Sequence, residues 1–432
     1  MSINDQFYLK VNNNSENERS SNRSKSSCIR RRPLPIFIFI PYFMYFLSIF
    51  LSSALIQQLI IDVACHKLIN DDCSDASVSK LSSRIFFYSS LCTQIPCFFM
   101  SGILGSLADR YGRKLILTIS SSGLLGYLLG IIYIAYYEPD DYILILLLSS
   151  SLYGFCGGFQ GFQLGCYSYL ADVTNNRVKY RTLYYSILES FLILSKVVGP
   201  SSAGYYASKK GFFPPLALAG LMSILVIINV NIIPESLPQD EQQPFIMEPL
   251  KSFQNIKLFF TLKTVKGKNP LPILAVAFGI FFTAYFGYLN VYVLYLKHVF
   301  DSSTETIGYY ASTESIICVF SMLLLPIIVQ KLLGNIIKSI YWVVIGYISQ
   351  SIFFFLFAAV TSEKEIFLCL IMLCLTGPII PMTRAIMVNS VAPHLQTTIL
   401  AGFSAVQSTS QLLCPVIIII YSDNGNPPTF FT

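Results

Sequence analysis

Runs of about 20 mostly apolar residues recur along this chain, and each is long enough to cross a bilayer as one helix. Six lie in the first half of the chain, near 36–61, 85–107, 115–136, 142–169, 183–207 and 213–233. Five lie in the second half, near 271–296, 307–329, 337–360, 366–388 and 398–420. Because a chain in lipid must satisfy its own backbone hydrogen bonds, these runs predict an all-α membrane protein.

Charge is scarce, and long stretches of the chain contain none. Of the 432 residues, 54% are apolar and only 12% are charged, about half the charge of a soluble domain. This excludes a soluble enzyme and a disordered polypeptide. The net charge of +6 comes from Lys and Arg in short loops rather than from one patch, so we expect no nucleic-acid partner.

The basic residues indicate how the chain is oriented. Twenty of the 29 fall in the N-terminal tail and in alternate loops, whereas seven fall in the opposite loops. Under the positive-inside rule, the N-terminus is expected in the cytoplasm. We therefore expect a cytoplasmic tail (1–33), a six-helix bundle (34–233), a cytoplasmic linker (234–268) and a five-helix bundle (269–432). Two similar bundles are a transporter architecture. Six and five spans therefore suggest that a twelfth helix is missing from this sequence, as in a truncated gene model or a splice form.

One loop, between the second and third runs, has an unusual spacing of glycines and charges. It contains Gly105, Asp109, Arg110, Gly112, Arg113 and Lys114. A helix must end there, turn tightly at a glycine and restart, and the acid and bases can pair with one another or with a helix end. An ordinary basic loop explains the cations but not the positions of the glycines and the acid.

This loop resembles the motif of the major facilitator superfamily, where such an acid and bases form a cytoplasmic latch between two bundles. Gly199-Pro200 and Pro234-Glu235-Ser236 are similar to further motifs of this superfamily. Within the superfamily, other segments resemble the proton-coupled folate transporter family: Ala171-Asp172-Val173-Thr174, Arg181-Thr182, Ile187-Leu188-Glu189, the run 211–215 and Arg384-Ala385. The resemblance covers roughly 34–425. It implies that Asp172 and Arg181 belong to the latch and that the protein transports a solute.

The chain differs from the folate-transporting members at two positions. Tyr285 stands where they carry a His before a Phe-Gly pair, and Gly158 stands where an Asp is expected. The solute class therefore stays open, with an anionic or amphipathic organic molecule as the expectation. The resemblance places the protein in the plasma membrane or an endolysosomal membrane.

Four charges lie inside the apolar runs, away from their ends, where each costs at least ~2.5 to 3.5 kcal/mol unless it meets water or a partner. They are Glu189, Lys196, Glu314 and Arg384. We expect Glu189 to be the protonation site and Arg384 to bind an anion or act as its counter-charge. A carboxyl beside a mobile cation can load and release protons. Counted from the helix ends, Lys196 and Glu314 lie about 20 and 18 Å above the inner face. The resemblance implies that the fifth and eighth spans touch across the interface between the bundles, so we expect these two residues to form an ion pair there. A purely structural role remains the alternative for each charge.

Polar uncharged residues are weaker candidates. Gln160 and Gln163, on a glycine-rich stripe, and Asn290 either face a polar cavity or satisfy neighbouring helices. Among 11 cysteines, only Cys65 and Cys73 lie in an outer loop, where they either form a short disulfide or remain free. No Cys or His cluster has metal-ligand spacing, and we expect neither a metal nor another cofactor.

The leading reading is a proton-coupled secondary transporter that works by alternating access on a small organic solute. Two alternatives remain open: a facilitative organic-anion carrier, and a non-transporting receptor or scaffold. A membrane-embedded enzyme is disfavoured because the sequence has no catalytic triad, metal cluster or phosphate-binding loop.

Overall fold

Helices make up all the regular structure of the described residues. The computed structural model describes residues 34–68, 76–175, 178–237, 251–261, 271–300, 304–332, 339–392 and 395–423. Within them, nine stretches of helix are long and apolar enough to cross a membrane. The predicted all-α membrane fold is thus confirmed, and the division into six and five spans stays a prediction.

The first half of the chain forms one short and seven longer helices. They are η1 (Pro35–Ile38), α2 (Phe39–Leu68), α3 (Ala76–Tyr111), α4 (Arg113–Tyr137), α5 (Tyr142–Phe155), α6 (Gly158–Val173), α7 (Val178–Lys210) and α8 (Phe213–Ile232). The second half and the linker form α9 (Lys251–Thr261), α10 (Leu271–Phe300), α11 (Thr304–Leu332), α12 (Ser339–Ala359), α13 (Glu363–Cys369), η4 (Leu370–Leu375), α14 (Ile379–Asn389) and α15 (Gln396–Asp423). Each predicted apolar run coincides with one helix or with two or three consecutive ones.

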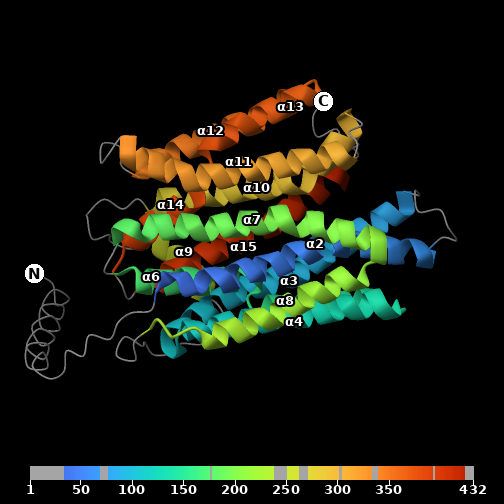
Figure 1. The fold of residues 1–432 in the computed structure, drawn as a ribbon, viewed down its shortest axis with the longest axis horizontal. Coiled ribbons are helices and arrows are strands. Elements are labelled where there is room, and N and C mark those ends of the chain that lie inside the picture. The colour runs from blue at the N-terminus through green and yellow to red at the C-terminus, as the bar shows by residue number, and fades with distance from the viewer. Residues whose placement is uncertain are drawn as a thin grey trace, which may run out of the picture. The chain divides into compact units, whose positions relative to one another are not determined.

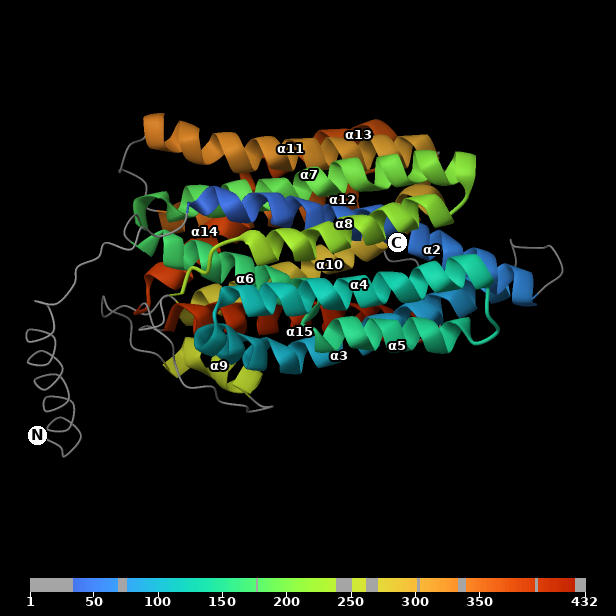
Figure 2. The same cartoon turned by 60° about the horizontal axis from the view of Figure 1, so that its bottom comes forward.

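The long helices lie side by side with their axes roughly aligned (Figures 1 and 2). Their outward faces are apolar: Ile232, Ile273 and Phe355 are each about three quarters exposed, at 76%, 75% and 74%. Such side chains are stable on a surface that faces lipid rather than water. The exposed rings and aliphatic chains therefore agree with the membrane location.

Contacts made by α7 and by α15 join the halves. Helix α7 of the first half packs on α11 and α14, and α3 packs on α15. The largest core cluster, built from first-half side chains, also takes in Ala385, Val388, Leu400 and Ala401 of the second half. The chain from Leu34 to Thr432 forms one unit by its contacts, so the predicted boundaries of two bundles stay a prediction.

Two of the predicted spans are interrupted rather than continuous. The run near 142–169 breaks between α5 and α6, where Gly157 and Gly158 have φ angles of +88° and +54°. The run near 366–388 passes from α13 through η4 to α14, which begins after Gly377 and Pro378. Glycine allows the left-handed backbone and proline stops a continuing helix. Interrupted helices near the middle of a membrane line binding sites in many transporters.

The linker helix α9 lies against both halves. It contacts α3 on one side and α15 and α10 on the other. Its Phe259 is fully buried, and Phe253 packs with its ring centroid 4.8 Å from that of Phe98 on α3. A Cβ atom at Gly402 of α15 would lie only 2.9 Å from the Phe259 ring, so glycine makes room for this docking.

The break at Gly157 yields a test of how the fourth run is shaped. Gly157→Ala should lower the free energy of unfolding by about 2 to 4 kcal/mol, because alanine disfavours this φ and its Cβ would clash with Leu104. Gly211→Ala is the control, since Gly211 has φ +79° but open space around its Cβ position. It should cost only about 1 to 2 kcal/mol. Thermal unfolding in detergent measures both, and equal losses would contradict the packing at Leu104.

Candidate transport site

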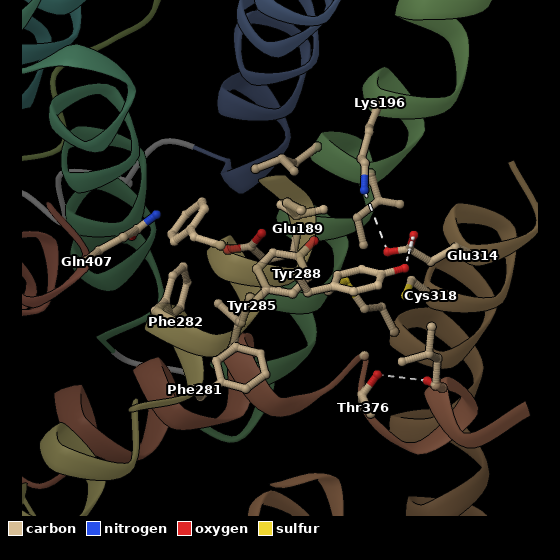
Figure 3. Close-up of a pocket in the computed structure, with 18 of the residues that line it drawn as sticks. Glu189, Lys196, Phe281, Phe282, Tyr285, Tyr288, Glu314, Cys318, Thr376 and Gln407 are labelled. Carbon is tan, nitrogen blue, oxygen red and sulfur yellow. Dashed lines mark hydrogen bonds and ion pairs between the residues drawn. The ribbon is translucent and has the colours of Figure 1, made fainter. Parts of the chain in front are cut away.

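A cavity of about 280 Å³ lies between the two halves of the chain, and its lining is mainly apolar (Figure 3). Helices α2, α6 and α7 contribute from the first half, and α10, α11, α12, η4, α14 and α15 contribute from the second. Aromatic rings form a large part of the wall, among them Phe46, Phe159, Phe281, Phe282, Tyr285 and Phe286. All four charges predicted from the sequence line this cavity: Glu189, Lys196, Glu314 and Arg384.

The first charged pair joins the halves at Glu189 of α7 and Arg384 of α14. The Arg384 Nη1 lies 2.5 Å from the Glu189 Oε1, and the side chains are only 3% and 4% exposed. The guanidinium also donates from Nη2 to Gln163 at 3.2 Å and to Gln407 at 3.4 Å. Because two helices of different halves share this buried pair, their separation would expose or strand both charges.

Aromatic groups surround the same guanidinium. The Arg384 Cζ lies 4.1 Å from the ring centroid of Tyr167 and 4.7 Å from that of Phe403, within the range of cation–π attraction. The Tyr167 hydroxyl donates a hydrogen bond to Glu189. Arg384 thus keeps favourable contacts on its planar faces even when a carboxylate leaves its edge.

The second charged pair joins Lys196 of α7 to Glu314 of α11. The Lys196 Nζ lies 3.7 Å from the Glu314 Oε1, so the predicted ion pair is confirmed. Figure 3 draws this pair as a dashed line. The other carboxylate oxygen of Glu314 accepts a hydrogen bond from Tyr288 at 3.2 Å. The Tyr288 hydroxyl lies 2.8 Å from that of Tyr310. Glu189 and Lys196 are two turns apart, so the pairs are separated by about 10 Å along α7.

The amide candidates divide into two groups. Gln163 lines the cavity and donates to the Tyr42 hydroxyl at 3.3 Å. Gln160 is 1% exposed and donates to Gln94 at 3.1 Å and to Gln411 at 2.6 Å, so it ties α6 to α3 and α15 outside the cavity wall. The alternative of helix packing therefore describes Gln160 better than solute contact does.

The predicted latch forms a compact ionic cluster. Arg113 pairs with Asp109 at 2.8 Å and with Asp172 at 2.9 Å. Gly112, with φ +99°, allows the turn before α4. Glu235, which follows α8, accepts hydrogen bonds from the backbone N–H groups of Arg113 and Lys114 at 2.8 and 3.1 Å and thereby caps α4.

The remaining latch residues have separate roles. Arg181 donates to Asn389 of α14 at 2.6 Å, which makes the cross-half contact that the resemblance implied for the whole latch. Gly105 packs closely on Ala401 of α15. Lys114 donates to the backbone oxygen of Asn231 at 2.7 Å, whereas Arg110 is exposed and stands outside the cluster. The ionic part of the latch thus lies within the first half, and the contact between halves depends on Arg181 and Gly105.

Three expectations fall on parts that the structure does not describe. Cys73 lies outside the described residues, and so does the side chain of Cys65, which leaves their disulfide a prediction. The side chain of Asn290 on α10 is likewise outside them. Within the described residues, no group of three or more His, Cys, Asp or Glu side chains could hold a metal ion.

Comparison with known proteins identifies the family. The family model of the Major Facilitator Superfamily matches residues 36–415. The chain belongs to this superfamily. Solved structures agree at the level of the fold: the human organic anion transporter MFSD10 superposes with a TM-score of 0.71 at 12% identity, over 92% of this chain and 94% of that one. The proton:xylose symporter XylE gives 0.63 at 14% identity, over 92% and 90%.

Two curated proteins show which members of the superfamily this chain resembles. It is 25% identical to the Homo sapiens lysosomal proton-coupled steroid conjugate and bile acid symporter, over 50% of this chain and 48% of the relative. It therefore spans about half the length of that relative. It is 22% identical to the Rattus norvegicus proton-coupled folate transporter, over 78% of this chain and 72% of the relative. The resemblance drawn from the sequence is thus confirmed, and the superfamily is one of transporters rather than enzymes.

Several residues of these sites carry no isolated signal in the sequence. Tyr167 and Asn389 are ordinary residues of apolar helices, and their partners lie 22 and 208 positions away. Glu235 was recognised only as part of Pro234-Glu235-Ser236. Glu235 directly follows a span, at the same membrane side as the glycine turn after which α4 begins. An acid in that position could have predicted its role as a cap of the α4 N-terminus.

The latch geometry of this superfamily member predicts unequal effects of its two acids. Asp172 accepts hydrogen bonds from Arg113 and also from Ser236 at 3.0 Å, whereas the side-chain hydrogen bond described for Asp109 is the one from Arg113. Asp172→Asn should therefore lower the free energy of unfolding by about 2 to 3 kcal/mol and Asp109→Asn by about 1 to 2 kcal/mol. Thermal unfolding of the two purified variants checks this, and a larger loss for Asp109→Asn would contradict the assignment.

Proposed function

We propose that this protein is a proton-coupled secondary transporter of amphipathic organic anions that works by alternating access. The observation that carries the proposal is the buried pair of Glu189 and Arg384 between the two halves. Its placement in a cavity with aromatic walls supports a solute with an apolar body. The names of the related transporters support proton coupling and an anionic solute.

The pair supplies a physical link between protonation and movement of the halves. While Glu189 is ionised, separating α7 from α14 leaves two unpaired charges in an apolar interior, which is strongly unfavourable. A proton on Glu189 removes one of these charges. Arg384 then keeps Gln163, Gln407 and the two rings as neighbours. Protonation therefore lowers the cost of the transition between the inward-open and outward-open states.

The cavity also favours one class of solute. Its apolar lining stabilises a rigid hydrocarbon body by burial, and its two cations favour a negative group. Steroid conjugates and bile acids, which the human relative carries according to its name, combine these two features. We propose the same class here, carried across a plasma or endolysosomal membrane with the N-terminus in the cytoplasm.

The proposal predicts a specific loss in one variant. Glu189→Gln keeps the shape of the side chain but cannot exchange a proton, so uptake of a bile acid driven by a pH gradient should fall at least tenfold in proteoliposomes. Exchange of bile acid without a gradient should fall less. Glu365→Gln, an exposed acid outside the cavity, is the matched control and should retain uptake.

The same measurement distinguishes the alternatives. Bile acid uptake by the wild type that does not respond to a pH gradient would support a facilitative carrier instead. If Glu189→Gln retained full gradient-driven uptake, the protonation site would have to be another group.

A further inference from the structure

The two cations of the cavity are satisfied to different degrees. The Arg384 guanidinium meets a carboxylate at 2.5 Å, two amide oxygens and two aromatic faces, and its side chain is 3% exposed. The Lys196 side chain is 24% exposed, the largest value among the four charged side chains of the cavity. Three of the five N–H donors of Arg384 reach acceptors at hydrogen-bond distance, whereas the three N–H donors of Lys196 share one contact at 3.7 Å.

The Lys196 ammonium is only loosely held in this structure. Its distance of 3.7 Å to Glu314 exceeds that of a charge-assisted hydrogen bond, which is about 2.7 to 2.9 Å. Within the described residues this ion pair is the contact recorded for Nζ, although an ammonium has three N–H donors. An anionic group that enters the cavity can therefore form short hydrogen bonds that Glu314 does not.

Glu314 is held from its other side, so it does not need Lys196 for its position. Its carboxylate accepts from Tyr288, whose hydroxyl is itself bonded to Tyr310, and the Glu314 side chain is 5% exposed. Lysine has a long flexible stem and can turn its ammonium away from this fixed acid. Figure 3 shows Lys196 reaching from α7 across the cavity toward Glu314.

We propose that Lys196 is the binding group for the anionic end of the solute, a carboxylate or sulfonate, and that Glu314 is the counter-ion which the solute displaces. This deepens the proposed transport function, on which it rests, and separates two tasks that the sequence left together. The Glu189–Arg384 pair responds to protons, and the Lys196–Glu314 pair recognises the solute. The aromatic side chains Phe281, Tyr285 and Phe286 then face the apolar body of the solute.

The proposal requires opposite effects from the two partners of one ion pair. Removing Lys196 removes the binding group, whereas removing the charge of Glu314 removes its competitor. A purely structural pair or gate predicts that both changes weaken binding, because each leaves one buried charge alone.

The experiment compares a matched pair of probes, 1-naphthaleneacetate and the uncharged 1-naphthaleneethanol. Binding to the purified full chain is measured by titration calorimetry in detergent at one fixed pH. The wild type should bind the anion about 10- to 100-fold more tightly than the alcohol, as expected for charge-assisted hydrogen bonds. Lys196→Met should abolish this preference, and Glu314→Gln should increase it several-fold.

Two further variants control for folding. Lys196→Met combined with Glu314→Gln leaves no buried charge alone, so it should fold and bind the two probes equally. Lys209→Met makes the same substitution at the exposed end of α7, where Lys209 contacts Tyr205, and should keep the preference of the wild type. Thermal unfolding confirms that each variant is folded.

Three results would overturn the proposal: no preference for the anion in the wild type, a preference that survives in the double variant, or weaker anion binding in Glu314→Gln. The titration uses neither a membrane nor a gradient, so its outcome is independent of proton coupling. A protein that shows no gradient-driven uptake can still prefer the anionic probe, and a protein with gradient-driven uptake can lack this preference. The two proposals can therefore fail separately.

Discussion

The high cost of an unpaired charge in an apolar interior governs how the helices of this protein meet. Each buried ion needs a partner, and in this chain the partners come from different helices. Arg113 joins α3, α4 and α6 through its two acids, Glu189 joins α7 to α14, and Lys196 joins α7 to α11. Few charges are present, so each one specifies a particular helix neighbour.

Helix α7 has a central position because it carries one member of both cavity pairs. The Glu189–Arg384 pair is short and its side chains are almost fully buried, whereas the Lys196–Glu314 pair is longer and its lysine is more exposed. Seven residues separate Glu189 from Lys196, so both side chains lie on nearly the same face of one helix. A single rigid element therefore connects the group that we assign to protons with the group that we assign to the solute.

The sequence predicted those features that depend on strong local or energetic signals. Apolar runs predicted the helices because lipid allows few other structures, and the depth of Lys196 and Glu314 predicted their pairing because both charges need a partner. The breaks in the fourth and tenth runs were not predicted. Gly157 and Pro378 are each compatible with a continuous or an interrupted helix, and the packing around them decides. Tyr167 was missed for a similar reason: its role depends on Arg384, which is distant in sequence.

Helix α9 of the linker connects the two halves of the chain. Its buried Phe259 sits against α15 at Gly402, while Phe253 packs on α3, so one short helix clamps the two helices across which the halves meet. A movement that separates α3 from α15 must detach α9 from one of them. The docking of α9 on both helices therefore stabilises the arrangement in which α3 and α15 lie together.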